Sequence, residues 1–166
     1  MLEWAVEKQN GPVAIRYPRG GDRSYQDSVF GDDFVHCHRC GDDVTIVTYG
    51  TLIENAMNAA KLLEEQGISA TVLRLLSVSP LPALQVADRL SANHRVVVLE
   101  ETCSGSGIRE ALAWQLQKLV PDCRVGGIDL GNQFVTHGNT NKLYEHYGLD
   151  AQSVAAYIQE VLAVEN

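Results

Sequence analysis

From residue 34 onward, short apolar runs alternate with segments in which apolar residues recur every three or four positions. The short runs are rich in β-branched residues and predict strands, whereas the longer period predicts helices. The predicted strands are residues 34–38, 44–49, 70–76, 95–100 and 124–129, and the predicted helices are residues 52–66, 84–92, 108–119, 139–147 and 151–163. This alternation predicts a three-layer α/β/α fold with a mostly parallel, five-stranded mixed sheet whose first strand is antiparallel.

The first 32 residues follow a different pattern. Residues 1–8 have helical character, Asn10-Gly11-Pro12 breaks it, and residues 13–17 predict a strand that Pro18 ends. A polar stretch without any apolar period follows. One helix and one strand cannot bury a core of their own. We therefore expect residues 1–20 to be the end of a preceding domain, residues 21–32 to be a linker, and residues 33–166 to form a second domain.

Charge and hydropathy exclude two classes of function. The chain has 13 Lys and Arg against 21 Asp and Glu, so its formal net charge is −8 and its pI is about 5.0. An acidic surface repels phosphate backbones, so we expect no nucleic-acid partner. No apolar run approaches the roughly 20 residues of a membrane-spanning helix, and the N-terminus does not resemble a signal peptide. We therefore expect a cytoplasmic protein without a membrane partner.

The chain contains four cysteines: Cys37, Cys40, Cys103 and Cys123. In the cytoplasm they are expected to be reduced thiols. Cys37 and Cys40, preceded by His36, resemble half of a zinc site, but such a site usually has four ligands and no second pair follows at suitable spacing. A redox-active pair normally opens a helix, whereas Gly41 and the two aspartates after it predict a turn. We expect no metal site, and favour a polar strand and turn that carries two thiols.

The main candidate site follows the predicted strand 95–100, where Glu100 and Glu101 precede Gly105 and Gly107. Ligands of open α/β sheets usually bind at the carboxyl ends of the strands, and glycines before a helix can cradle an anion at its N-terminus. The spacing is not a dinucleotide-binding fingerprint, because Glu110 stands where the third glycine would be. Close packing of helix on strand, with an acidic interface, is the favoured alternative.

Three further side chains are weaker candidates. Cys103 lies before a predicted helix, where thiols become more acidic, but nothing in the sequence places His94, His137 or His146 beside it as a base. His137 itself lies between a strand and a helix at the same sheet edge, and suits either a substrate contact or a helix start. Arg19 follows a proline at the end of a predicted strand, so its guanidinium suits either a phosphate or carboxylate ligand or a salt bridge. We assign no catalytic residue.

Four segments, taken in order, resemble the 1-deoxy-D-xylulose-5-phosphate synthases, a group of thiamine-diphosphate enzymes in the transketolase family. Residues 11–20 (GPVAIRYPRG) resemble the end of their pyrimidine-binding domain. Residues 43–52 (DVTIVTYGTL) resemble the first core strand of their C-terminal domain. Residues 97–107 resemble a later strand of that domain, which is followed by two glutamates and a glycine turn. Residues 134–150 (FVTHGNTNKLYEHYGLD) resemble its closing segment, with a phenylalanine and a terminal Gly-Leu-Asp.

The resemblance implies an enzyme that condenses pyruvate with glyceraldehyde 3-phosphate, releases carbon dioxide and supplies isoprenoid precursors. It implies thiamine diphosphate and Mg²⁺ in upstream domains, a homodimer, and no cofactor in this part of the enzyme. The second arginine of RYPRG binds the acceptor's phosphate in that family, which carries over to Arg19. The family's thiamine-binding segment and catalytic histidines are not in this sequence, so we expect the chain to be inactive alone.

Other functions remain open on the sequence. A transketolase or the E1 β-type subunit of a 2-oxo acid dehydrogenase shares the same C-terminal domain, although RYPRG and the closing Gly-Leu-Asp favour the synthase group. From different classes, a stand-alone anion-binding α/β module would use Gly105 and Gly107, and a zinc-bound interaction domain would use Cys37 and Cys40.

Overall fold

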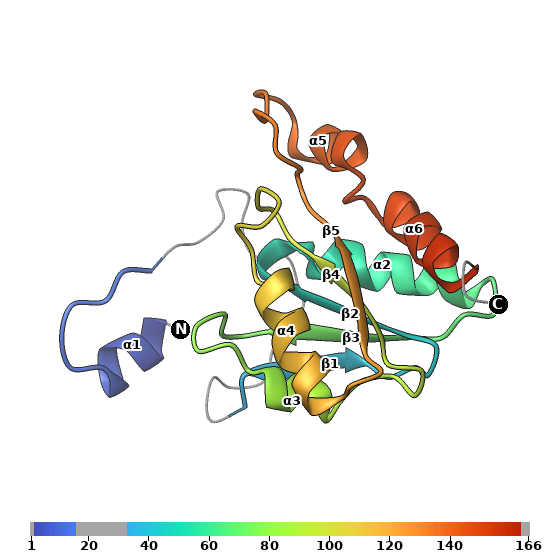
Figure 1. Cartoon of the computed structure of the whole chain (residues 1–166). Coiled ribbons are helices and arrows are strands. Elements are labelled where there is room, and N and C mark those ends of the chain that lie inside the picture. The colour runs from blue at the N-terminus through green and yellow to red at the C-terminus, as the bar shows by residue number, and fades with distance from the viewer. Residues whose placement is uncertain (1, 16–32, 164–166) are drawn as a thin grey trace.

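The computed structural model describes residues 2–15 and 33–163 (Figure 1). The strands are β1 (Val35–Arg39), β2 (Val44–Tyr49), β3 (Ala70–Leu75), β4 (Arg95–Leu99) and β5 (Arg124–Ile128). The helices are α1 (Leu2–Lys8), α2 (Ile53–Glu64), α3 (Ala83–Ala87), α4 (Arg109–Leu119), α5 (Thr140–Tyr147) and α6 (Ala151–Ala163), with a 3₁₀ turn at Gly50–Leu52 before α2.

The five strands form one mixed sheet in the order β1-β3-β2-β4-β5. β2, β3, β4 and β5 are parallel, and β1 pairs antiparallel with β3 at one edge, with Val35 opposite Leu75. The predicted mixed sheet with an antiparallel first strand is therefore confirmed. β1 pairs with β3 and not with β2, which follows it in the chain.

Gly41 is where the chain crosses from β1, past the start of β3, to β2. A Cβ at this position would lie 2.6 Å from the backbone nitrogen of Ala70, so only glycine fits. The Gly41 N–H donates to Thr71 Oγ1 (2.9 Å), and that hydroxyl donates to the Gly41 carbonyl (2.6 Å). These contacts fix the crossing turn against the start of β3, which places β1 on the outer side of β3.

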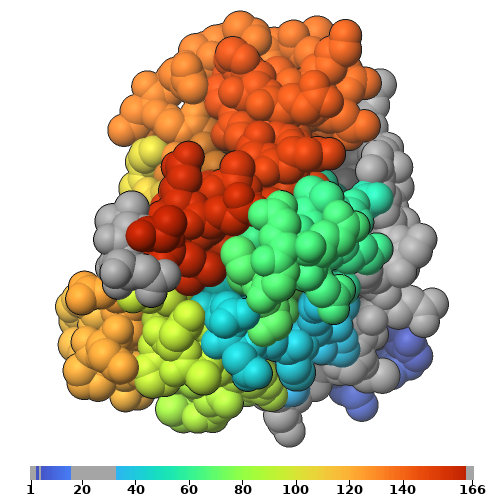
Figure 2. All heavy atoms as spheres, turned by 90° about the vertical axis from the view of Figure 1, so that its right-hand side faces the viewer, coloured from blue at the N-terminus to red at the C-terminus, as the bar shows by residue number. Residues whose placement is uncertain are grey.

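Helices cover both faces of the sheet, so the three-layer architecture is also confirmed (Figure 1). α2 and α6 pack on one face over a core that includes Ile46, Leu63 and Ile158. α3 and α4 pack on the other face over a core that includes Val47 and Leu112. Ile46 and Val47 belong to opposite cores because successive side chains of a strand point to opposite faces. Figure 2 shows α6, in red, beside the green region at the end of α2.

The N-terminal part differs from the prediction. α1 agrees with the predicted helix and lies apart from the sheet in Figure 1. Residues 13–15 form no strand, because a strand needs a neighbour for its backbone hydrogen bonds and none lies beside them in the described part of the chain. Residues 16–32, which include Arg19 and the predicted linker, lie outside the described residues.

Helix ends account for the smaller differences. The helix predicted over residues 84–92 covers only Ala83–Ala87, and the one predicted over 52–66 ends at Glu64. Among the described helices, none is long and apolar enough to cross a membrane.

Candidate functional site

Glu100 lies directly after β4, at the carboxyl edge of the parallel strands, but its side chain points inward and only 2% of the residue is exposed. Its Oε2 accepts from the Ile108 N–H (2.8 Å) and its Oε1 from the Arg109 N–H (3.3 Å), both at the start of α4. The Tyr49 hydroxyl at the end of β2 also donates to Oε2 (3.3 Å). Glu100 therefore caps the N-terminus of α4 from the end of a strand.

Gly107 makes room for this cap. A Cβ built at Gly107 would overlap the carboxylate of Glu100. The backbone N–H groups that could have bound an anion at the start of α4 donate to a carboxylate of the chain itself. Burial and the charge of Glu100 raise the pKa of Tyr49 to about 12, so this hydroxyl is a donor at neutral pH.

Asp129 follows β5 at the same edge and forms a second, partly buried network. Its carboxylate accepts from Ser104 Oγ (2.7 Å) and the Gly131 N–H (2.8 Å), and Arg109 Nη2 lies 2.9 Å from Oδ2. Burial opposes ionisation of Asp129, but these hydrogen bonds and the Arg109 charge lower the pKa of its carboxyl. The loop after β4, the first turn of α4 and the end of β5 are thereby joined.

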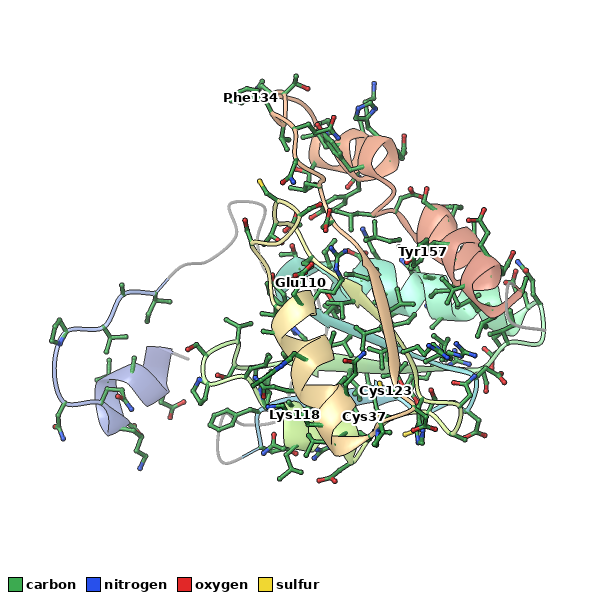
Figure 3. All side chains as sticks on the ribbon, viewed as in Figure 1. Cys37, Glu110, Lys118, Cys123, Phe134 and Tyr157 are labelled. Atoms are coloured by element: carbon green, nitrogen blue, oxygen red, sulfur yellow. The ribbon has the colours of Figure 1, made fainter. Side chains whose placement is uncertain are left out.

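Arg109 is held by more than Asp129. Its Nη2 also lies 2.9 Å from Glu110 Oε1 in the first turn of α4, where Figure 3 labels Glu110. Burial disfavours the charged guanidinium, but the Glu110 hydrogen bond and the charges of Asp129 and Glu110 raise the pKa of Arg109. Its aliphatic stem crosses β5 at Gly127, where a Cβ would lie 2.9 Å from Arg109 Cδ.

Glu101 lies on the solvent side of the same loop and connects it to α5. Its Oε1 accepts from the Tyr144 hydroxyl (2.5 Å). α5 begins at the cap Asn139, whose side chain accepts from the Asn141 and Lys142 N–H groups, and ends at Gly148 in the left-handed conformation (φ 72°). The loop after β4 is thus fixed on its outer side as well.

The remaining predicted site residues are dispersed. Gly105 is exposed in the turn before α4, and His137 is exposed in the segment before α5, so neither joins the Glu100 or Asp129 network. Phe134, in the same segment as His137, is 92% exposed and lies at the far tip of the molecule in Figure 3. Arg19 lies outside the described residues, so its role stays a prediction.

Cys103 and His94 are not paired as nucleophile and base. Cys103 is exposed, and His94, one of its three possible bases, pairs instead with Asp122 through Nδ1 (2.9 Å). No group of three or more histidine, cysteine, aspartate or glutamate side chains among the described residues is arranged to hold a metal ion. The carboxylates of Glu100 and Asp129 have their hydrogen-bonding and charged partners within the chain itself.

Sequence reasoning missed Asp129, Arg109, Ser104, Tyr49 and Tyr144. Asp129 could have been predicted, because it ends a predicted strand at the same edge as Glu100 and parallel strands bring their carboxyl ends together. Arg109 and the two tyrosines carried no local signal, since their partners lie far away in the sequence.

Comparison with known proteins agrees with this architecture. Residues 35–154 match the family described as the C-terminal domain of transketolase. This chain belongs to that family. The match covers all five strands, helices α2 to α5, the start of α6 and the whole Glu100 and Asp129 network.

Curated relatives of this chain include 1-deoxy-D-xylulose-5-phosphate synthases. The chain is 34% identical to the enzyme of Gloeobacter violaceus over 99% of its own length and 27% of the relative's. It is 36% identical to that of Chlorobium phaeovibrioides, over 96% of its length and 26% of the relative's. The chain therefore spans about a quarter of the length of the curated relatives it matches.

Two solved structures have a similar fold. A split-gene transketolase, described as an inactive beta4 tetramer, is 28% identical with a TM-score of 0.70, and covers 90% of this chain and 47% of its own. A transketolase from Pichia stipitis is 20% identical with a TM-score of 0.59, and covers 79% of this chain and 18% of its own, which supports the shared fold alone.

Proposed function

We propose that this chain is the C-terminal domain of a 1-deoxy-D-xylulose-5-phosphate synthase, which condenses pyruvate with glyceraldehyde 3-phosphate and releases carbon dioxide. The observation that carries the proposal is the extent of the similarity. The synthases match 93–99% of the chain, including residues before the family match begins at residue 35. RYPRG lies in that leading part.

The role of this domain in the enzyme is structural. Its acidic edge is internally satisfied, so it offers a rigid surface on which upstream domains can pack. Those domains would hold thiamine diphosphate and Mg²⁺, and thiamine diphosphate, when bound, would supply the carbanion chemistry of the condensation. We propose that the working enzyme is a homodimer in the cytoplasm and that this domain has no activity alone.

Products of the full-length enzyme test the function. With pyruvate and glyceraldehyde 3-phosphate, we expect 1-deoxy-D-xylulose 5-phosphate and carbon dioxide. The isolated 166-residue chain should form neither and should show no thiamine diphosphate binding by calorimetry. A full-length protein that ignores pyruvate would refute the proposal.

A transketolase is the second candidate, supported by the TM-score of 0.70 to the split-gene transketolase. The same preparation distinguishes the two, because a transketolase moves a two-carbon unit from a ketose phosphate to an aldose phosphate without releasing carbon dioxide. Transfer of that kind, in the absence of pyruvate turnover, would favour this candidate.

Arg19 is proposed to bind the acceptor's phosphate. In the full-length enzyme, Arg19→Ala should raise KM for glyceraldehyde 3-phosphate roughly ten- to a hundredfold, because a charge-assisted hydrogen bond contributes about 1.5–3 kcal/mol. KM for pyruvate should stay near the wild-type value. Equal changes in both KM values would contradict a specific phosphate contact.

A further inference from the structure

Cys37 and Cys40 lie close together at the edge of the sheet opposite to the Glu100 network. Their sulfur atoms are 3.4 Å apart, and Cys37 Sγ also lies 3.2 Å from the Arg39 carbonyl oxygen. Cys37 is half-buried against the core beneath α3 and α4, whereas Cys40 is exposed. Figure 3 labels Cys37 at this end of the molecule.

A bulge in β1 brings the two thiols to the same side. In a regular strand, residues three apart point to opposite faces. Here the pairing of β1 with β3 shifts between Cys37, opposite Leu73, and Arg39, opposite Val72, so His38 is an extra residue. The juxtaposition is therefore built into the strand.

The frame around the pair is fixed on both sides. Cys37 belongs to the ladder with β3, and Arg39 forms an ion pair with Glu64 of α2 (2.7 Å). Beyond Cys40, two hydrogen bonds join the Gly41 backbone to the Thr71 hydroxyl. Closing a disulfide requires the sulfurs to approach to about 2.05 Å, a small change that side-chain rotation can supply while this frame stays in place.

We propose that Cys37 and Cys40 are a redox modification site that small-molecule disulfides, such as oxidised glutathione, convert to an intramolecular disulfide. The Cys40 thiolate attacks one sulfur of the oxidant, whose S–S bond breaks, and the departing thiolate takes a proton from water. Cys37 then loses its proton and attacks Cys40 Sγ, which releases the second glutathione thiolate. The chain loses two electrons and two protons, and one glutathione disulfide becomes two thiols.

The two thiols have different roles in this sequence. Cys40 is exposed and meets the oxidant first. Burial, together with the neighbouring Cys40 thiol, raises the pKa of Cys37 to about 11, so this thiol stays protonated and reacts second. Cys103 is also exposed, but no cysteine among the described residues is recorded beside it, which makes it a matched control.

The test uses the full 166-residue chain, reduced and then exposed to oxidised glutathione, followed by an acid quench, thiol alkylation and intact mass measurement. We expect a product that carries two fewer alkyl groups than the reduced chain and that, measured without alkylation, is about 2 Da lighter, with the bond mapped to residues 37–40. Cys103→Ser should form this bond at the wild-type rate. Dithiothreitol should restore both thiols.

Two variants separate the proposed order from simple surface thiolation. Cys37→Ser should stop at a glutathione adduct on Cys40. In Cys40→Ser, a change at an exposed position, Cys37 should react with oxidised glutathione at least tenfold more slowly than Cys40 reacts in the wild-type chain. The proposal fails if the wild-type chain also stops at a stable adduct on Cys40. It fails equally if Cys103→Ser prevents the mass loss.

Discussion

Glu100 occupies the position where sheets of this class usually bind a ligand, yet its carboxylate caps a helix of its own chain. This cap requires a glycine at the neighbouring position 107. Gly107 has no alternative residue, because any side chain would enter the space of the Glu100 carboxylate. Two adjacent acids therefore have different roles, since Glu100 is internal and Glu101 faces solvent.

Gly107→Ala tests this arrangement. The added methyl should push Glu100 away from the N-terminus of α4 and leave buried N–H groups unpaired, lowering the free energy of unfolding by about 2–4 kcal/mol. Gly138→Ala is the control, because a Cβ there would meet only Leu143 at ordinary contact distance, 3.4 Å or more. Urea unfolding measures both, and equal losses would contradict the role of Gly107.

Because of Asp129, the free energy of unfolding should depend on pH in the acid range. Its pKa is lower in the folded state, so its contribution is present above the unfolded pKa of about 4 and is lost as pH falls through the folded value. Asp129→Asn keeps acceptors for Ser104 and Gly131 but loses the charge facing Arg109, which should cost about 2 kcal/mol at neutral pH.

The measurement is urea unfolding between about pH 7 and pH 2. The stability difference between wild type and Asp129→Asn should shrink as pH falls below about 4. Asp88→Asn, at an exposed position after α3, should leave the profile unchanged. A constant offset at all pH values would show that the Asp129 charge does not matter.

At the scale of elements, β5 depends on two adjacent glycines for contacts on its two faces. Gly126 faces Tyr157 of α6, whose hydroxyl would lie 2.8 Å from a Cβ and accepts from the Gly127 N–H (3.3 Å) (Figure 3). Gly127 faces α4, where Arg109 crosses the strand. The layers can approach β5 closely because these two positions have no side chain.

A double-mutant cycle tests this packing. Gly126→Ala should cost about 1–2 kcal/mol, and Tyr157→Phe should recover most of that cost, because it removes the hydroxyl in the way. Gly127→Ala should not be rescued by Tyr157→Phe, since its obstacle is the backbone carbonyl of Val98. Additive effects of Gly126→Ala and Tyr157→Phe would contradict the contact.

At the scale of the whole molecule, one aromatic side chain at its tip is almost fully exposed. Phe134 is 92% exposed on the segment before α5, and the chain spans about a quarter of its relatives' length. As a prediction, we expect Phe134 to contact the upstream domains of the proposed full-length enzyme. A large apolar side chain left in water gains nothing for the isolated domain.

Phe134→Ser should therefore change the stability of the isolated chain by less than about 0.5 kcal/mol. In the full-length enzyme it should weaken assembly and lower the unfolding temperature of the multidomain protein. Trp114→Ser is the control, because Trp114 is 61% exposed but covered by Lys118 of its own helix. Thermal unfolding and sedimentation compare them, and an unaltered full-length enzyme would remove the role of Phe134.

Much of this fold was predictable because each helix and strand has a local apolar period. The strand 44–49 was predicted with its observed bounds, and the strand 124–129 differs only by Asp129. The strand predicted over residues 13–17 does not form at residues 13–15, because strand formation depends on a neighbour, which local sequence does not reveal. The pairing of β1 with β3 was missed for the same reason.

The sequence by itself determined the α/β architecture, the mixed sheet and the acidic, glycine-containing loop after β4, because periodicity and turn residues act over a few positions. Only the tertiary structure decided what the acids of that loop do. Glu100 meets the start of α4, Asp129 meets Arg109, and a bulge against β3 turns Cys37 toward Cys40. Each of these contacts depends on how strands pair and helices pack across the sheet, and that geometry is set by the whole chain.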